Sequence, residues 1–278
     1  MRRFIAMYKL ARPTTSLSGA MAVILGGYVA GTGEWLHIIL AAIATFLATG
    51  AANAWNDYLD IEIDRINQPQ RVLPAGLMSL QGAWVFSVGL TLIALLIAAF
   101  INLPSFLVAL AATVVLYVYS WKLKSTVLMG NATVATISAL SAVFGGVAAG
   151  NVFPTFWLAI IIATAIMGRE VLKTIADYEG DLRQRCRTIA TVWGKRPARI
   201  VFYILLAATA WMMMVPYLRD VYKPIYAYIV AVGVYPIIIY VLIKVGRNSS
   251  NHQLDRLSRL MKYDFFIWFV AVILGATG

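Results

Sequence analysis

Nine long apolar segments, separated by short polar stretches, dominate the pattern of the sequence. Each segment is close to the roughly 20 mostly apolar residues that an α-helix needs to cross a membrane. Their hydrophobic residues are continuous rather than alternating, so the pattern predicts helices and not the strands of a barrel. The nine predicted spans are residues 14–29, 35–55, 80–100, 105–119, 126–149, 153–175, 198–218, 224–245 and 260–276.

The composition agrees with this pattern and indicates an integral membrane protein. Hydrophobic residues make up 61% of the chain and charged residues 13%, with a mean hydropathy of +0.79, whereas soluble domains contain about 25% charged residues. The pairs Gly26-Gly27 and Gly145-Gly146 are typical of helices that approach each other closely. No long linker or change in composition divides the chain, so we expect one all-α transmembrane domain over residues 1–278.

The basic residues are distributed very unevenly over the loops. Of the 23 basic residues, only Arg219 and Lys223 fall on the side opposite to the N-terminus. By the positive-inside rule, this distribution predicts nine spans, a cytosolic N-terminus and an external C-terminus. The others are Arg2, Arg3, Lys9, Arg12, Arg65, Arg71, Lys122, Lys124, Arg169, Lys173, Arg183, Arg185, Arg187, Lys195, Arg196, Arg199, Lys244, Arg247, Arg256, Arg259 and Lys262.

Several other classes of function are disfavoured. A net charge of +11 is compatible with nucleic-acid binding, but in a membrane protein topology and anionic lipid explain it, so we expect membrane lipid as a partner and no nucleic acid. The single cysteine, Cys186, excludes an intramolecular disulfide. His37 and His252 are isolated, which argues against a histidine-based zinc or iron site. The basic start, residues 1–13, has no cleavage site and is interpreted as a cytosolic cap.

An acidic motif follows the second apolar segment. Helical positions four apart lie one turn above another, so Asn56, Asp60 and Asp64 share a face. Asp57 lies at the edge of this face, and Glu62 points away. Carboxylates crowded on one stripe repel each other unless a cation lies between them, and Mg²⁺ is the hard cation most often shared with phosphates. The structural alternative is a solvated acidic helix end outside the membrane.

A second motif follows the sixth apolar segment. Arg169, Lys173, Asp177 and Asp181 repeat every four residues, which puts cations deeper in the membrane and carboxylates nearer its surface. Ionisable residues inside a span usually line a cavity or face a partner. An ordinary helix ion pair between Lys173 and Asp177 is the structural alternative, and it leaves the rest of the face unexplained.

A third polar segment, residues 119–124, lies on the same side after the fourth apolar segment. It contains Tyr119, Lys122 and Lys124. The structural alternative here is an aromatic and basic anchor at the membrane interface.

Two acidic helix faces with lysine and arginine nearby suit a diphosphate that carries an apolar tail. Carboxylates bind Mg²⁺, the metal bridges phosphate oxygens, and cations neutralise the leaving group. Cleavage of an allylic carbon–oxygen bond leaves cationic character on carbon, which aromatic faces stabilise. A secondary transporter is the alternative from another class, although its site is expected at the membrane midplane. The aromatic candidates are Trp55, Tyr58, Tyr117, Tyr119 and Tyr178.

The pattern Asn56-Asp57-x-x-Asp60-x-x-x-Asp64, followed by Asp177-x-x-x-Asp181, resembles the paired aspartate-rich motifs of the UbiA superfamily of intramembrane prenyltransferases. The resemblance covers essentially the whole chain and includes Tyr119, Lys124 and Asn131. It implies a helical bundle around a central cavity, dependence on Mg²⁺, and transfer of a polyprenyl group from its diphosphate. The implied location is the cell membrane, as a multi-pass protein whose active site faces the cytosol.

The resemblance also implies a role for particular residues. It implies Mg²⁺ binding by Asn56, Asp60, Asp64, Asp177 and Asp181. It implies a catalytic set formed by Asp57, Asp60, Asp64, Asp177, Asp181 and Lys124. It implies substrate contacts from Asn56, Arg65, Arg71, Tyr119, Lys124, Asn131, Arg169, Lys173 and Tyr178.

The stretch after the first motif, residues 64–76, is similar to the branch that holds digeranylgeranylglyceryl phosphate synthases, chlorophyll synthases and homogentisate prenyltransferases. The second motif looks most like the glyceryl phosphate enzymes, and a phosphate-bearing acceptor needs cations such as Arg169 and Lys173. We therefore expect a geranylgeranyl-type group to be transferred to geranylgeranylglyceryl phosphate, forming an ether lipid. The alternative acceptors are 4-hydroxybenzoate, homogentisate or a chlorophyllide. One departure is that residues 13–16 lack an asparagine often found there in the family, so Thr15 or Ser16 would position the acceptor instead.

Overall fold

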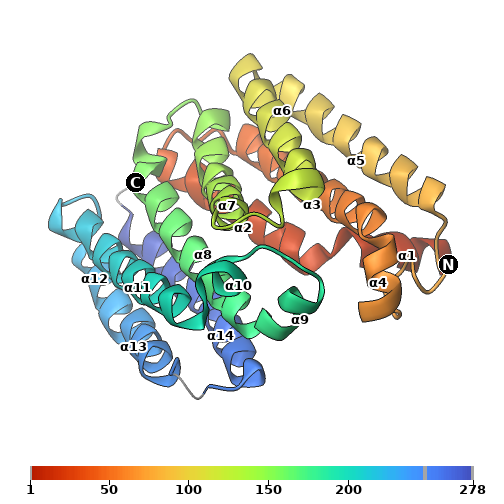
Figure 1. Cartoon of the computed structure of the whole chain (residues 1–278). Coiled ribbons are helices and arrows are strands. Elements are labelled where there is room, and N and C mark those ends of the chain that lie inside the picture. Colours follow the sequence, from red (N-terminus) through yellow and green to blue (C-terminus); the bar gives the residue numbers. More distant parts are fainter. Residues whose placement is uncertain (1, 247–248, 277–278) are drawn as a thin grey trace. The chain divides into compact units, whose positions relative to one another are not determined.

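The computed structural model describes residues 2–246 and 249–276, and it is built from helices (Figure 1). The described residues contain no β-strand, and the one bridge between extended residues joins Tyr222 to Ala276. The chain divides into two compact units, Met1–Leu123 with Leu140–Thr155, and Lys124–Ala139 with Phe156–Gly278. Arg247, one of the residues used to predict the orientation, lies outside the described residues.

The first unit is organised around α3 (Trp35–Leu59), against which α1 (Arg2–Ala11), α2 (Pro13–Ala30), α5 (Leu80–Ile101) and α6 (Leu103–Val118) pack. The short α4 (Ile61–Asn67) follows α3, the π-helix η1 (Tyr119–Leu123) follows α6, and the 3₁₀ turn η2 (Phe153–Thr155) ends the unit. Its largest core cluster consists mainly of alanines, including Ala41, Ala44 and Ala94. Such small side chains let helices approach closely in a membrane, where apolar burial alone gives little drive for association.

One glycine of each predicted pair lies where two helices of this unit approach each other closely. A Cβ atom on Gly26 of α2 would lie 1.9 Å from the carbonyl oxygen of Ala142 in α7 (Met129–Ala148), and one on Gly145 would lie 2.0 Å from that of Val23. No side chain fits at such distances. The prediction that these glycines allow close helix packing is confirmed.

The second unit contains α8 (Phe156–Ala176), which packs against α11 (Lys195–Leu218) and α14 (Asn251–Gly275). The short helices α9 (Tyr178–Arg183) and α10 (Ile189–Trp193) lie between α8 and α11 in the chain. A continuous helical segment follows, formed by α12 (Pro224–Ile229), the π-helix η3 (Val230–Val234) and α13 (Tyr235–Lys244). The indole of Trp268 donates to the hydroxyl of Tyr226 at 3.1 Å, and that hydroxyl donates to the Met213 carbonyl at 2.6 Å.

Every predicted span corresponds to a helix, with differences at the ends. The eighth span was predicted as one continuous segment, and within it lies the π-helix η3, beside which Pro236 lacks the N–H needed for a regular α-helical bond. The ninth begins at Asn251 rather than at residue 260, because Ser250 caps the helix by accepting from the Gln253 N–H. Among the described residues, seven helices are long and apolar enough to cross a membrane, and α2 and α14 are not among them. The number of nine spans therefore stays a prediction.

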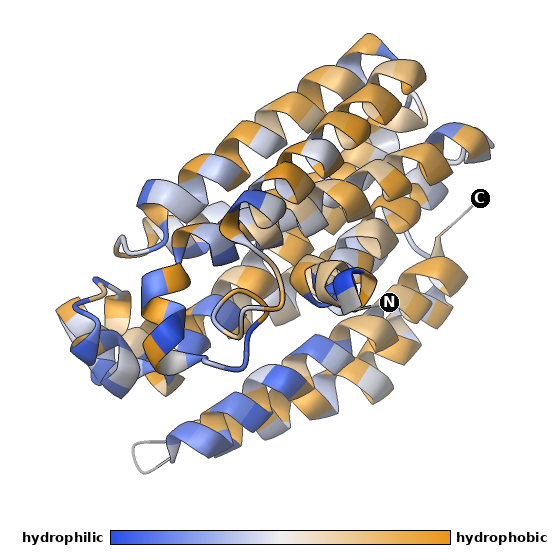
Figure 2. Cartoon of the chain, turned by 90° about the vertical axis from the view of Figure 1, so that its right-hand side faces the viewer, coloured by the Kyte–Doolittle hydropathy of each residue, from blue (hydrophilic) through white to orange (hydrophobic). Residues whose placement is uncertain are grey.

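Large apolar side chains lie on the outside of the long helices. Phe100 and Ile204 are examples, with exposed fractions of 82% and 62%. Figure 2 shows that most long helices are hydrophobic along most of their length, whereas hydrophilic residues gather at short helices, at loops and in the first half of α14. This distribution is what a lipid environment requires.

Candidate active site

The residues of the first acidic motif form the first half-site and lie where α3 ends. They are Asn56, Asp57, Asp60 and Asp64. Asp60 has backbone angles φ −88° and ψ 5°, which interrupt the helix between α3 and α4. The N–H of Asp60 still bonds to the Asn56 carbonyl at 3.0 Å, and the N–H of Asp64 bonds to the Asp60 carbonyl at 2.8 Å. The predicted spacing of four is therefore preserved across a small break that the sequence pattern did not indicate.

Two arginines hold the buried carboxylates of this half-site. Asp57 and Asp64 are each only 4% exposed. Arg12 forms an ion pair with Asp57, and Arg71 pairs with Asp64 at 2.7 Å and lies 3.6 Å from Asp57. Buried carboxylates need such partners, because an unpaired charge in the interior is costly. Arg71 was predicted as a site residue from the resemblance, whereas Arg12 was not.

The remaining polar residues of the motif are more exposed. The Asn56 side chain donates to a carboxylate oxygen of Asp60 at 3.0 Å, so its own oxygen stays available as a ligand. Glu62 points away from the motif, as predicted, and pairs with Arg65 at 3.0 Å on the exposed face of α4.

An aromatic cluster lies next to the motif in the same unit. The ring of Trp55 stacks on Tyr58 at 5.4 Å and on Tyr117 at 5.1 Å between centroids. The Tyr117 hydroxyl lies 2.8 Å from the hydroxyls of both Ser87 and Thr91. Three of the five predicted aromatic candidates are thus brought together, with π faces of the kind that stabilise a cation.

The third polar segment is split between the two units. Tyr119 begins the π-helix η1, and the ammonium group of Lys122 lies 4.1 Å from the Trp121 ring, consistent with an interface anchor. Lys124 and the buried Asn131, in the first turn of α7, belong to the second unit.

The second half-site, which contains Asp177 and Asp181, repeats the backbone geometry of the first. Asp177 has φ −86° and ψ 4°, nearly the angles of Asp60, and it likewise separates a long helix, α8, from a short one, α9. Its N–H bonds to the Lys173 carbonyl at 2.8 Å, and the Asp181 N–H bonds to the Asp177 carbonyl at 2.9 Å. Each unit therefore has a long helix that ends in an aspartate, with a second aspartate one turn later.

The cations of the second motif pair with a residue that was not predicted to belong to the site. Arg169 contacts Glu170 at 3.1 Å, and Lys173 contacts the same carboxylate at 3.4 Å. The simple ion pair between Lys173 and Asp177, considered as the structural alternative, is not the contact that forms. Arg169 also donates to the Ser258 carbonyl at 3.3 Å, which ties α8 to α14. Tyr178 lies under the ammonium group of Lys195, at 4.3 Å.

The carboxylates of the second half-site hold protons more tightly than usual. Burial raises the pKa of Asp177, the charges of Asp255 and Glu170 add to the effect, and Lys173 opposes it. Burial also raises the pKa of Asp181 to about 6, helped by the charge of Asp177, while a hydrogen bond from Thr188 and the charge of Lys173 oppose the shift. Burial is the main cause of both raised pKa values, and repulsion between neighbouring carboxylates adds to it.

Arg12, Glu170, Asp255 and Thr188 are residues of the two half-sites that sequence reasoning missed. Arg12 lies 45 positions before Asp57, and Asp255 lies in α14, so neither shares a helical repeat with a motif. A faint signal was available for Arg12, which directly precedes Pro13 at the start of the first apolar segment. Within the described part of the chain, no three His, Cys, Asp or Glu side chains are grouped closely enough to hold a metal by themselves.

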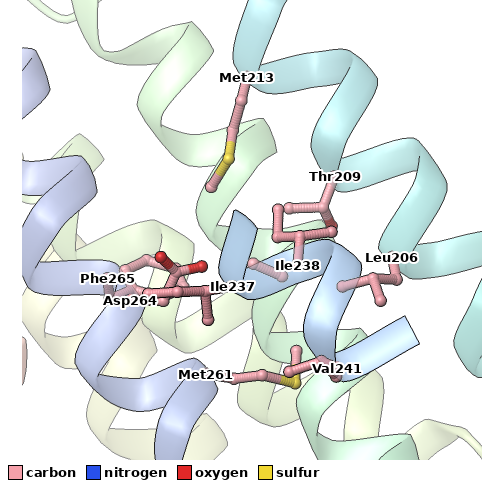
Figure 3. Close-up of a pocket in the computed structure, with 10 residues that line it drawn as sticks. Leu206, Thr209, Met213, Ile237, Ile238, Val241, Met261, Asp264 and Phe265 are labelled. Carbon is pink, nitrogen blue, oxygen red and sulfur yellow. The ribbon is translucent and has the colours of Figure 1, made fainter. Parts of the chain in front are cut away.

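A separate small cavity lies among α8, α11, α13 and α14 of the second unit (Figure 3). Its volume is about 20 Å³, which is room for about one water molecule. The carboxyl group of Asp264 points into it among apolar side chains, and its Oδ1 is buried without a hydrogen-bond partner in the described structure. Thr209 is the other polar residue of the lining, and its hydroxyl donates to the Leu205 carbonyl.

Comparison with known proteins gives concordant results. The model of the UbiA prenyltransferase family matches residues 18–270. The chain is 31% identical to digeranylgeranylglyceryl phosphate synthase of Methanosphaera stadtmanae, over 96% of this chain and 98% of that protein. A solved structure from work on digeranylgeranylglyceryl phosphate synthase in membranes is similar with a TM-score of 0.83 and 27% identity, over 99% of both chains. A UbiA homologue from Archaeoglobus fulgidus bound to GPP and Mg²⁺ is similar with a TM-score of 0.71 and 20% identity, over 96% of this chain and 99% of that one.

Proposed function

The chain belongs to the UbiA prenyltransferase family, and we propose that it transfers a geranylgeranyl-type group from its diphosphate to geranylgeranylglyceryl phosphate. The product is an ether lipid. The observation that carries this proposal is the similarity to a digeranylgeranylglyceryl phosphate synthase over 96% of the chain. Both aspartate motifs lie within the matched region.

The metal of this reaction is proposed to be Mg²⁺. Its ligands would be Asn56, Asp60, Asp64, Asp177 and Asp181, because carboxylate and amide oxygens are the donors that Mg²⁺ prefers. The repulsion between Asp177 and Asp181, which adds to the effect of burial on the pKa of Asp181, supports the fit, because a divalent cation would relieve it. When bound, Mg²⁺ neutralises charge on the diphosphate. Asp57 would support the set by holding Arg12 and Arg71 rather than by binding metal itself.

The diphosphate would be bound by cations as well as through the metal. Lys124, Arg65 and Arg71 are proposed to contact its oxygens and to stabilise the leaving group as the allylic carbon–oxygen bond breaks. The stacked cluster around Trp55 would then face the cationic carbon. The further substrate contacts proposed are Tyr119, Asn131 and Tyr178.

The acceptor phosphate would be bound by Arg169 and Lys173. Glu170, in contact with both, would hold their charged groups in place until the acceptor phosphate binds. The primary hydroxyl of the acceptor would then attack the allylic carbon as the diphosphate leaves, and its proton would pass to water or to the released diphosphate as the ether forms. An aromatic acceptor would not need both cations.

The proposal includes the topology in the membrane. Both units would form one catalytic domain with nine spans around a central cavity, inserted in the cell membrane. The N-terminus and both motifs would face the cytosol, because 21 of the 23 basic residues fall on that side in the nine-span topology.

Purified protein with Mg²⁺ and labelled geranylgeranyl diphosphate tests the reaction. Parallel reactions would contain geranylgeranylglyceryl phosphate, 4-hydroxybenzoate, homogentisate or a chlorophyllide. We expect an ether lipid that is lost with EDTA and with Asp60→Ala but kept with Glu62→Ala, a matched control because Glu62 is an exposed carboxylate of the same segment. Product formed only with an aromatic or chlorin acceptor would refute geranylgeranylglyceryl phosphate as the acceptor. If no diphosphate were released with any of these acceptors, a transporter would be favoured instead.

The assignment of the acceptor cations has its own test. Arg169→Ala and Lys173→Ala should each raise the KM for geranylgeranylglyceryl phosphate while leaving the KM for the prenyl diphosphate nearly unchanged. An unchanged acceptor KM in both variants would contradict their role.

A further inference from the structure

The helix α1 is separated from α2 by a sharp turn at Arg12. The backbone of Arg12 has φ 47° and ψ 67°, a left-handed conformation that is uncommon for a residue with a side chain. The helix therefore does not continue along the direction of α2. Its 10 residues rise about 15 Å, roughly half of the hydrocarbon thickness of a bilayer, so it does not cross the membrane alone.

The two faces of α1 have different surroundings. Ala6 and Leu10 are buried against a cluster that includes Ala54 of α3 and Leu73. On the outer surface, Phe4 is 74% exposed and Tyr8, four residues later, is 61% exposed. The flanking Arg3 and Lys9 are also exposed, and residues 1–33 contain no aspartate or glutamate.

We propose that α1 lies in the headgroup layer of the membrane, binds anionic lipid, and positions the first half-site through Arg12. Exposed aromatic residues combined with basic residues and no acidic ones are the composition that favours an interfacial helix on an anionic surface. Basic residues near such a surface strengthen the attraction to anionic lipid. Charge complementarity thus identifies the partner as the anionic lipid surface.

The end of α1 is fixed to α3 at several points. The carbonyl of Ala11 accepts from the side chain of Asn53 at 3.1 Å and from the hydroxyl of Ser16 at 3.0 Å. One turn further along α3, Asp57 forms the ion pair with Arg12. The turn between α1 and α2 therefore cannot shift without disturbing the segment that leads into the first motif.

The contacts continue from Asp57 to the rest of the half-site. Arg71 lies 3.6 Å from Asp57 and donates to both oxygens of Asp64 at 2.9 and 2.7 Å. The two residues after Arg71, Val72 and Leu73, belong to the cluster that buries the inner face of α1. Arg12 is thus a positioning residue, which acts through Asp57 on the guanidinium of Arg71. This role rests on the proposed function, in which Arg71 contacts the diphosphate.

Lipid binding by α1 can be measured without any assay of catalysis. In a Cys186→Ser background, a spin label is attached to Phe4→Cys, and to Glu62→Cys as an exposed control, in nanodiscs of phosphatidylcholine with or without phosphatidylglycerol. We expect the label at residue 4 to be more accessible to oxygen than to a water-soluble nickel complex, and more strongly so with phosphatidylglycerol. The label at residue 62 should favour nickel in both. Equal nickel accessibility at the two positions would overturn the lipid contact.

The positioning role is tested by kinetics in the same nanodiscs. Losing an outer partner that orients a metal ligand typically costs about 10- to 100-fold. By analogy, Arg12→Gln should raise the KM for the prenyl diphosphate by about tenfold with a smaller change in kcat. Arg12→Lys, which keeps the charge, should recover part of the loss. Because α1 binds anionic lipid, the KM of the wild-type enzyme for the prenyl diphosphate should differ between nanodiscs with and without phosphatidylglycerol. The double variant Arg3→Gln/Lys9→Gln should remove this difference.

Failure of the two proposals can be told apart. An Arg12→Gln variant with the wild-type KM would overturn the positioning role while the wild-type enzyme remains active. A wild-type protein that releases no diphosphate would refute the proposed function, and the spin-label result would stand independently of it.

Discussion

Replacing Gly26 by alanine should force α2 and α7 apart in the first unit. The new Cβ atom would lie 1.9 Å from the Ala142 carbonyl oxygen, 2.7 Å from its carbon and 3.0 Å from its Cα. All three atoms belong to the backbone, so no side-chain rotation relieves the overlap. An unstrained contact is about 3.5 Å, which requires the helices to separate by about 1.5 Å.

The size of the effect follows from two opposing terms. In an unobstructed helix, alanine is more favourable than glycine by about 1 kcal/mol. Overpacking in a close contact costs about 1–3 kcal/mol and sometimes more, and a gap of only 1 Å already removes up to about half of the dispersion energy of the atoms beside it. Because the overlap here is with rigid backbone, we expect a net loss of about 2 kcal/mol.

The matched control is Gly89→Ala in α5, where a new Cβ atom meets nothing within 4 Å. The two variants should differ by about 3 kcal/mol, or about 6–12 °C in Tm for a chain of this size. Thermal unfolding of both variants in the same detergent measures this difference. If Gly26→Ala melted within about 2 °C of Gly89→Ala, the close helix approach would be refuted.

Three further predictions concern the charged groups. The Asp181 carboxyl has a pKa of about 6, above its ordinary value, so below that pH it is protonated and Mg²⁺ must displace the proton. Calorimetry should therefore show weaker Mg²⁺ binding at about pH 5.5 than at about pH 7.5. Equal affinities at the two pH values would contradict this. Asp264→Leu should raise Tm, since an unsatisfied buried polar group costs about 1–3 kcal/mol. Asp264→Asn is the control. A lower Tm or lost activity of Asp264→Leu would instead reveal a ligand of Asp264. Arg71→Gln should lower the free energy of unfolding by about 1–3 kcal/mol, because it leaves Asp64 unpaired. Arg65→Gln should change that free energy by less than about 1 kcal/mol, because its partner Glu62 is exposed. Similar melting curves for the two variants would contradict this difference.

The sequence predicted those features that depend on local repetition. Apolar length gave the helices, and spacing by four gave both aspartate motifs, because these follow from helical geometry alone. The break at Asp60 was not predictable, since the same spacing fits an unbroken helix. Arg12 and Asp57 meet across 45 positions, and only the packing of α1 on α3 determines that contact. For the same reason, the pairing of Lys173 with Glu170 rather than Asp177 depends on side-chain surroundings that periodicity does not describe.

The alanine-rich core has a consequence for how such proteins diverge. At buried positions such as Ala41 and Ala94 a larger residue would have to displace its neighbours, whereas outward positions face lipid tails that are as apolar as the side chains themselves. Exchanges among leucine, isoleucine, valine and phenylalanine outside should therefore be nearly neutral, and substitutions can accumulate there without altering helix spacing. A protein with only 27% identity can then retain the same backbone, as the TM-score of 0.83 illustrates. Over evolutionary time, the small residues would preserve the architecture while the large ones drift.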